Sequence, residues 1–210
     1  MISRCLSKIS LIFIFLLLIS MSVVFAKENF TGTPVTSFQG IEWKAGQEQI
    51  ERWALDRNAK FIDASSKYNG VMTTLIYKGT YGDEQAEYRF TLYKGQFYQV
   101  NIYCESISES VLLDRWQKFK QLLSQKYGNP SYDFYFFKSP YYNGDGYELQ
   151  AIRLNKGTAK TYWNRPIGDG DNAIVSCEVT SMMSLRVSYQ HVEIADIAVD
   201  DYNLQKSRDM

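Results

Sequence analysis

Short stretches of alternating apolar and polar residues, separated by tight turns, constrain the fold of this chain more than any other feature. Residues 86–93 alternate aromatic or apolar side chains with charged or polar ones, and Lys94 with Gly95 leads into a second such stretch at 96–104. Strict alternation is typical of a strand with one buried face. Connections this short join neighbouring antiparallel strands. The region therefore predicts an antiparallel meander, in which residues 71–77 form a further strand.

Two segments show helical spacing instead. Residues 108–127 carry apolar side chains three to four positions apart, and Gly128 ends the run. Residues 46–58 do the same over a shorter length, with Ile50 and Trp53 on one face. Clustered strands with two separated helices predict an α+β fold, with antiparallel sheet of about seven to nine strands and both helices packed on one face.

The second half of the chain is expected to consist mainly of strands. We expect one domain over 37–194, or two half-domains that meet near 128–131, followed by a C-terminal tail at 195–210 that forms a helical turn or two and then frays. The further strands are expected at 132–138, 148–154, 161–164, 173–180 and 185–192.

The first 26 residues have the layout of a secretory signal peptide. Arg4 and Lys8 precede an apolar run at 11–19, and small residues lead to a cleavage position after Ala26. A retained anchor is the alternative, but the stretch from Ile9 to Ala26 is slightly short for a bilayer span, and Ser10, Ser20 and Ser22 interrupt it. We therefore expect a protein exported to the periplasm or secreted, with no membrane span after cleavage and a flexible lead-in at 27–36.

The charge balance argues against nucleic acid as a partner. The chain has 23 basic and 23 acidic residues, and the signal peptide holds two of the basic ones, so the mature chain would carry 21 against 23, a net charge of −2. Nucleic-acid binding calls for a basic face. We expect an envelope or extracellular protein as the partner instead.

Two cysteines are left after cleavage, Cys104 and Cys177. Each falls on the apolar face of an alternating stretch, so the two could meet across a core. An even pair in an exported protein is a disulfide candidate. Two separate buried thiols are the alternative.

No motif in the sequence indicates catalysis or a cofactor. The single histidine, His191, lies at the end of an expected strand, and no serine or cysteine of the chain has a nucleophile motif such as G-x-S-x-G. A partly exposed histidine at a strand end is therefore a simpler interpretation than a catalytic one. The acidic turns at 143–146 and 168–172 offer oxygen ligands for calcium but do not match the EF-hand pattern. Asp, Asn and Gly are also the common residues of ordinary turns. We expect no metal site and no cofactor.

Four aromatic residues in expected loops are the candidate binding residues. Tyr141 and Tyr142 precede one Asn–Gly turn, and Tyr162 and Trp163 precede an Asn–Arg–Pro segment. Exposed aromatic rings can stack on a sugar or anchor a protein partner. Packing in the core is the alternative use of such side chains.

Several short motifs follow one another along residues 38–190. In their order they resemble a pattern found in uncharacterised exported bacterial α+β proteins, and more loosely the small envelope domains of the SmpA/OmlA type. That resemblance implies a non-enzymatic domain that acts through protein contacts. Lys44 departs from the pattern, which often has Gly after the Trp, and no lipidated Cys is present. The motifs are Phe38-Gln39-Gly40-Ile41-Glu42-Trp43, Lys94-Gly95-Gln96-Phe97, Leu123-Ser124-Gln125-Lys126-Tyr127-Gly128-Asn129-Pro130, Trp163 and Leu185-Arg186-Val187-Ser188-Tyr189.

Three functions are consistent with the sequence. The first is an exported, non-enzymatic domain that binds a protein in the cell envelope. The second is a small-ligand or glycan binder that uses the aromatic residues, and the third is a hydrolase with carboxylates brought together by the fold. An exposed aromatic patch would favour the first, an aromatic-lined cleft the second, and a pocket with two converging acids the third.

Overall fold

The structure is a computed structural model, and it describes residues 33–68, 70–105, 108–168 and 170–208. The expected signal peptide, its cleavage position after Ala26 and residues 27–32 of the expected lead-in lie outside the described residues. Within the described residues, no helix combines the length and the apolar character that crossing a membrane requires.

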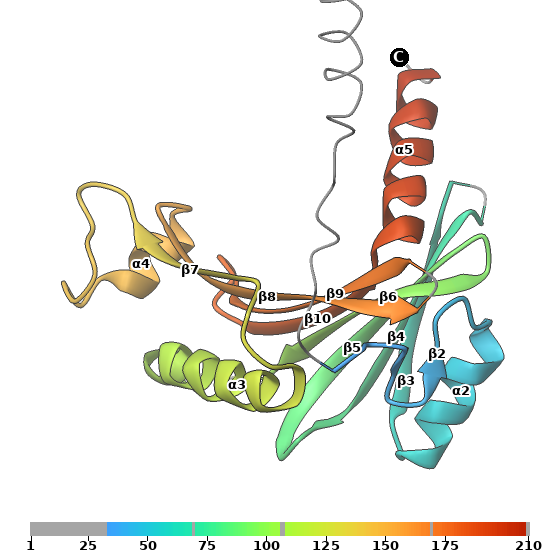
Figure 1. The fold of residues 1–210 in the computed structure, drawn as a ribbon, viewed down its shortest axis with the longest axis horizontal. Coiled ribbons are helices and arrows are strands. Elements are labelled where there is room, and N and C mark those ends of the chain that lie inside the picture. The colour runs from blue at the N-terminus through green and yellow to red at the C-terminus, as the bar shows by residue number, and fades with distance from the viewer. Residues whose placement is uncertain (1–32, 69, 106–107, 169, 209–210) are drawn as a thin grey trace, which may run out of the picture. The chain divides into compact units, whose positions relative to one another are not determined.

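Eight antiparallel strands form one continuous sheet, in the order β3-β4-β5-β6-β10-β9-β8-β7. Two four-strand meanders, β3 to β6 and β7 to β10, join where β6 pairs with β10. The expected antiparallel α+β architecture is confirmed (Figure 1). The strands are β3 (Lys60–Lys67), β4 (Met72–Tyr81), β5 (Glu84–Tyr93), β6 (Gln96–Cys104), β7 (Tyr132–Phe137), β8 (Gly157–Gly168), β9 (Asp171–Val179) and β10 (Leu185–His191).

Two helices cover one face of the sheet, as the sequence predicts. They are α2 (Gln47–Asp56) and α3 (Leu112–Tyr127), the latter entered through a 3₁₀ turn, η1 (Glu109–Val111). A two-stranded ribbon of β1 (Ser37–Phe38) and β2 (Ile41–Glu42) packs with them. The apolar spacing of α3 places its buried side chains on the sheet, because residues three and four apart share one helix face. Those side chains are Leu112, Trp116, Phe119, Leu123 and Tyr127.

The core between these helices and the sheet is rich in aromatic rings. Trp116 and Trp163 are both fully buried, from α3 and β8 respectively. The indole of Trp163 donates to the carbonyl of Gly128 at 3.0 Å, and that of Trp116 donates to the carbonyl of Cys177 at 3.2 Å. Each buried N–H therefore has a partner, as a dry core requires.

A buried arginine fixes the loop that ends α3. Arg165 is only 2% exposed, and its guanidinium donates to the carbonyl oxygens of Tyr127, Asn129 and Asn164. The last carbonyls of a helix have no partner inside it. Arg165 supplies one, and it ties the turn between α3 and β7 to β8.

The described residues contain four α-helices rather than the two expected. The segment predicted as a strand at 148–154 is the short helix α4 (Glu148–Arg153), which buries Ala151 and Ile152. The carboxylate of Asp145 accepts from the amide of Tyr147 at 2.7 Å just before the helix, a turn that starts helices well. Alternation alone did not distinguish a helix this short from a strand.

The expected fraying tail is helix α5 (Val192–Arg208). Ile194, Ala195 and Ala198 pack on Tyr93 and Tyr98 in a small second cluster. This helix rises from the side of the sheet opposite to α2 and α3 (Figure 1). The expectation that helices pack on a single face therefore holds only for α2 and α3.

The expected disulfide is not formed. Cys104 and Cys177 are both free, buried and on the core face, but β10 lies between their strands. Two strand spacings separate them by about 10 Å, beyond the roughly 7 Å between Cα atoms that a bridge allows. Alternation predicted the correct face, but it carries no information on strand order.

The two thiols should be inert in the folded protein. Burial raises the pKa of Cys104 to about 12 and raises that of Cys177 well above its usual value. Since the thiolate is the reactive form, we expect iodoacetamide at pH 8 to leave both unmodified in the native state. In denaturant without reductant, both should be alkylated, as read by peptide mass spectrometry. Failure to label them in denaturant would indicate a disulfide.

Removing the Trp163 side chain should destabilise the fold strongly. Trp163→Ala leaves a cavity in the core and removes the donor to Gly128, and we expect a loss of about 3–5 kcal/mol in urea unfolding. Tyr162→Ala, next to it on the opposite face of β8, is the matched control, with an expected loss of about 1 kcal/mol or less. Equal losses would contradict the assignment of the two faces.

Candidate functional site

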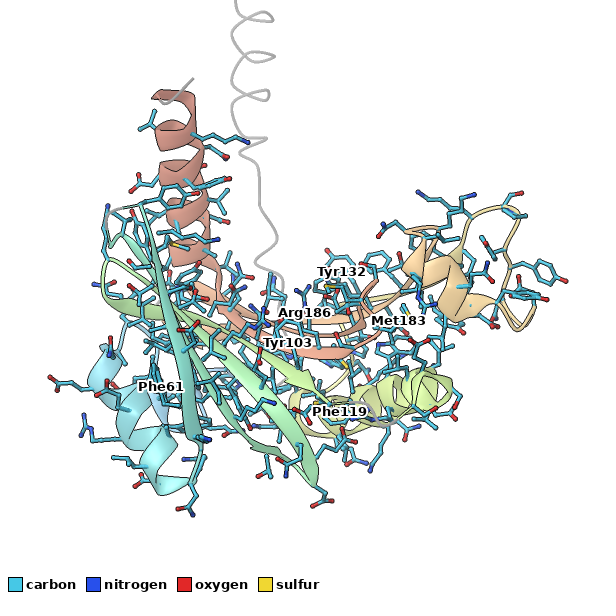
Figure 2. The ribbon with its side chains drawn as sticks, turned by 180° about the vertical axis from the view of Figure 1, so that it is seen from behind. Phe61, Tyr103, Phe119, Tyr132, Met183 and Arg186 are labelled. Carbon is cyan, nitrogen blue, oxygen red and sulfur yellow. The ribbon has the colours of Figure 1, made fainter. Side chains whose placement is uncertain are left out.

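The side of the sheet not covered by α2 and α3 presents polar and charged side chains, and we call it the open face. Alternation places these residues beside core residues on the same strands, so that Tyr103 follows buried Ile102 and Arg186 precedes buried Val187. Tyr103, Arg186 and Tyr132 lie on this side, whereas Phe119 lies under the sheet with α3 (Figure 2). The central residues of the open face are Glu87, Arg89, Asn101, Tyr103, Lys160, Tyr162, Ser176, Glu178, Arg186 and Ser188.

A groove of about 730 Å³ lies on the open face, at the end of the sheet away from α5. Its floor is formed by the strands β5, β6, β10, β9 and β8, and the β9–β10 turn forms one wall. Met182, in that turn, is 88% exposed. The volume falls in the range of sites that hold a small ligand or several residues of a peptide.

A carboxylate between two cations forms the centre of the groove. Glu178 is 8% exposed, its Oε2 lies 2.7 Å from the Lys160 ammonium, and its Oε1 pairs with the Arg186 guanidinium. Burial acts to lower the pKa of both cations, but Glu178 and neighbouring tyrosine hydroxyls outweigh it, so the pKa of each is raised. Lys160 and Arg186 are therefore charged, and the Arg186 Nε is a buried donor without a hydrogen-bond partner among the described residues.

A third cation, Arg89, extends this centre across β5 and β6. The Arg89 guanidinium lies 4.7 Å from the centre of the Tyr103 ring, and its Nε lies 2.6 Å from the Glu87 carboxylate. A ring face attracts a guanidinium electrostatically, so Tyr103 and Glu87 together hold Arg89 in place. The charged residues that line the groove balance one another, since three are cationic (Arg89, Lys160 and Arg186) and three are anionic (Glu87, Glu105 and Glu178).

Exposed aromatic rings extend the open face to its outer strand, β7. Tyr132, Phe134 and Phe136 are 59%, 39% and 45% exposed, and they alternate onto the same side as Tyr162 and Lys160 of β8. The rings of Tyr132 and Phe134 stack with centres 6.2 Å apart, and Phe134 meets Tyr162 edge-on at 6.0 Å. We call these four rings (Tyr132, Phe134, Phe136 and Tyr162) the aromatic row.

The four candidate aromatics from the sequence do not form one site. Tyr162 and Trp163 are consecutive residues of β8, so Tyr162 joins the aromatic row while Trp163 is fully buried on the other face. Tyr141 and Tyr142 lie in the turn before α4, where Tyr142 is 66% exposed. Tyr132, Phe134 and Phe136 were not identified from the sequence as candidate binding residues. Aromatic residues at every second position of 132–136 were the pattern that could have indicated an aromatic strand face.

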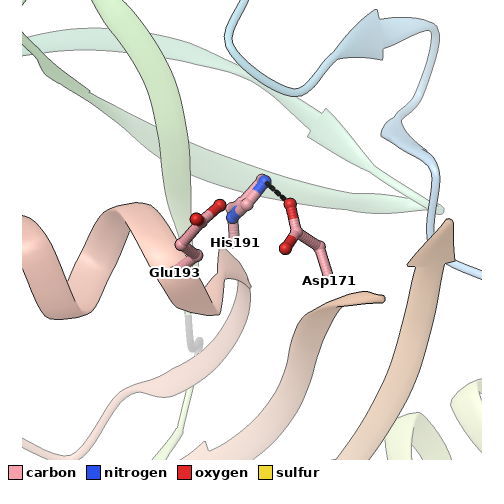
Figure 3. A group of neighbouring side chains, drawn as sticks. All are labelled: Asp171, His191 and Glu193. Carbon is pink, nitrogen blue, oxygen red and sulfur yellow. Dashed lines mark ion pairs between the residues drawn. The ribbon is translucent and has the colours of Figure 1, made fainter. Parts of the chain in front are cut away.

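A second cluster lies at the opposite end of the sheet, where β9 begins and β10 ends (Figure 3). It consists of Asp171, His191 and Glu193, with one ligand-type atom of each within 4.8 Å of the others. His191 is 1% exposed, not partly exposed as the sequence suggested. Burial, and then the charge of Lys44, lower the pKa of His191 against the opposing effect of the two carboxylates. The imidazole is therefore neutral near pH 7.

The acidic turn at 143–146 is an ordinary turn. The Asp145 carboxylate accepts from the amides of Tyr142 and Tyr147, and the Glu148 carboxylate accepts from the amide of Gly144. These oxygens already have donors from the chain itself. The other acidic turn, at 168–172, contributes Asp171 to the histidine cluster.

Comparisons with protein-family models, with curated proteins and with solved structures gave no match.

Removing the charge of Glu178 should destabilise the protein, because it leaves Lys160 and Arg186 without their counter-ion. For Glu178→Gln we expect a loss of about 2–4 kcal/mol in urea unfolding. Glu87→Gln, which breaks a more exposed pair with Arg89 on the same face, is the control, with an expected loss of about 0.5 kcal/mol. Equal effects of the two variants would show that Glu178 is not buried between its cations.

Proposed function

We propose that this protein is an exported, non-enzymatic domain that binds a protein partner, and that the partner lies in extended form along β7 and the open face. The observation that carries the proposal is the aromatic row. Three of its four rings are exposed on the outer strand β7, and the fourth, Tyr162 on β8, lies against Lys160 of the charged groove. Exposed aromatic residues are the usual anchors of protein interfaces.

The backbone of β7 supports an extended partner. β7 is the last strand in the sheet order, and no other described strand pairs with its outer side. An added strand from another chain can satisfy such a free edge, while side chains alternate into neighbouring pockets. The aromatic row would meet every second side chain of that strand.

The other edge of the sheet lacks these features. β3 has a bulge between Phe61 and Asp63, and its two ends carry Lys60 and Lys67. Bulges and charged residues are the common protection of an edge strand against added strands. The difference between the two edges favours β7 as the binding edge.

The groove supports a partner with an acidic side chain next to the bound strand. The Arg186 Nε is a buried donor with no acceptor among the described residues, and Arg89 and Lys160 line the same groove. A carboxylate of the partner would give the Arg186 guanidinium a further charge-assisted hydrogen bond.

The cell envelope as the location is part of the proposal and is supported by the signal-peptide layout of residues 1–26. The resemblance of short motifs to SmpA/OmlA-type domains supports the same location and stays a hypothesis. N-terminal sequencing of the protein from its native cells should begin at Lys27. A sequence that begins at Met1 or Ile2 would contradict export by cleavage.

A glycan is the second candidate ligand. Tyr132 and Phe134 are nearly parallel, with an angle of 8° between their planes, and flat aromatic faces can stack on sugar rings. A soluble oligosaccharide mixture tested beside the peptides separates the two candidates.

Peptide binding tests the proposal. Peptides selected from a random dodecapeptide display library on the immobilised protein should be rich in alternating apolar residues with an acidic residue. Phe134→Ala should weaken the best peptide about tenfold or more, because an anchoring ring is lost. Phe61→Ala is the matched control, since Phe61 is an exposed ring on the opposite edge strand; it should leave affinity unchanged.

Amide shifts on peptide binding should fall on β7, β8 and the groove. Shifts centred on β3, or equal losses in the Phe61 and Phe134 variants, would overturn this binding face. Binding of the oligosaccharides with no selected peptide would favour the glycan instead.

A further inference from the structure

We infer that Asp171, His191 and Glu193 form a binding site for a divalent transition-metal ion, of which Zn²⁺ suits the ligand set best. The site is independent of the proposed binding face, because it lies at the other end of the sheet. Its three residues come from three elements: the first residue of β9, the last residue of β10 and the first turn of α5 (Figure 3).

The spacing of the ligand atoms suits a small ion. One atom from each of the three residues lies within 4.8 Å of the other two. Ligands about 2.0–2.2 Å from a tetrahedral ion lie roughly 3.3–3.6 Å from one another. The required shift is therefore about 1 Å, and Asp171 and Glu193 keep enough exposure to make it, at 32% and 55% of their side chains.

The histidine itself indicates a missing partner. His191 is 1% exposed, yet its Nδ1 has no hydrogen-bond partner among the described residues. Its Nε2 lies 3.6 Å from the Asp171 carboxylate, which is longer than a hydrogen bond. Buried polar groups are nearly always satisfied. The Trp43 ring, edge-on at 5.9 Å, packs against the imidazole.

A cation already lies between the carboxylates. The Lys44 ammonium is 3.7 Å from the Asp171 carboxylate and 3.8 Å from the Glu193 carboxylate. Its single positive charge can balance only one of these two negative charges. The Lys44 backbone has φ +70°, in the left-handed region that favours glycine. The side chain is 49% exposed, so it can move into solvent when an ion takes its place.

The ligand types select the class of ion. One imidazole and two carboxylates suit Zn²⁺ and its neighbours in the first transition row, whereas Mg²⁺ and Ca²⁺ prefer all-oxygen sites. A bound ion would join the start of α5 to the ends of β9 and β10. Helix α5 packs on the sheet through Ile194, Ala195 and Ala198, and Asp201 further along the helix pairs with Tyr93 and Lys94. Metal binding should therefore hold the first turns of the helix more firmly.

The single histidine of the chain makes the test unambiguous. ZnCl₂ is titrated into the untagged protein by calorimetry, and the imidazole ¹⁵N signals are followed by NMR. We expect one site per chain, a shift of the His191 nitrogen signals on binding, and slower amide exchange in residues 193–198. Lack of any His191 shift at saturating Zn²⁺ would overturn the site.

Two variants with opposite effects separate this site from scattered surface binding. Glu193→Gln should weaken Zn²⁺ binding more than tenfold, because a charged ligand is lost. Lys44→Gln should strengthen it about tenfold, because a competing cation is removed at close range. Lys94→Gln is the matched control for Lys44, since Lys94 also has positive φ and lies 3.0 Å from a carboxylate, that of Asp201. Equal effects of the two lysine variants would contradict the inference.

Discussion

Helices α2 and α3 cover one face of the sheet and leave most of the other face open, and the charged surface of the protein depends on this difference. Helices α2 and α3 with the β1–β2 ribbon bury the apolar side of β4, β5, β6, β8, β9 and β10, while α5 reaches only one end of the other side. Because side chains alternate along a strand, each strand that supplies the core must also supply the open face. The open face is therefore rich in charge, and its charges are paired with one another before any ligand arrives.

The charges are paired differently at the two ends of the sheet. At the groove, Glu178 is satisfied by Lys160 and Arg186, so a partner adds to an existing ion network. At the end near α5, two carboxylates share one ammonium and a buried imidazole has an unpartnered nitrogen. The first arrangement is the one for which we propose a protein partner, and the second is the one for which we infer an ion. The proposed binding face and the inferred ion site therefore lie at opposite ends of the sheet.

The sequence predicted the class of fold and most of its elements. The turns at 94–95 and 128–130 and the face of α3 are local features, and local patterns are sufficient to locate them. Strand order is not local. For this reason the sequence placed Cys104 and Cys177 on the correct face, but not two strands apart. Helix α4 is too short to show a period, and α5 has too few apolar residues at helical spacing to stand out.

The candidate site was harder to predict than the fold. Tyr162 and Trp163 looked alike in the sequence, yet adjacent positions in β8 send one to the surface and the other to the core. Glu178, Lys160 and Arg186 belong to three strands and meet only through pairings across the sheet. The aromatic row was readable as an alternation in 132–136, but its exposure depends on β7 being an outer strand.

Backbone hydrogen exchange with and without a bound partner peptide tests the central claim most directly. In the free protein, the β7 amides that face away from β8 should exchange rapidly, because no described strand covers them. On binding, these amides should become protected while those of β3 do not change. Protection confined to β3 or to α5, with β7 unchanged, would contradict the assignment of the open face and its outer strand as the binding surface.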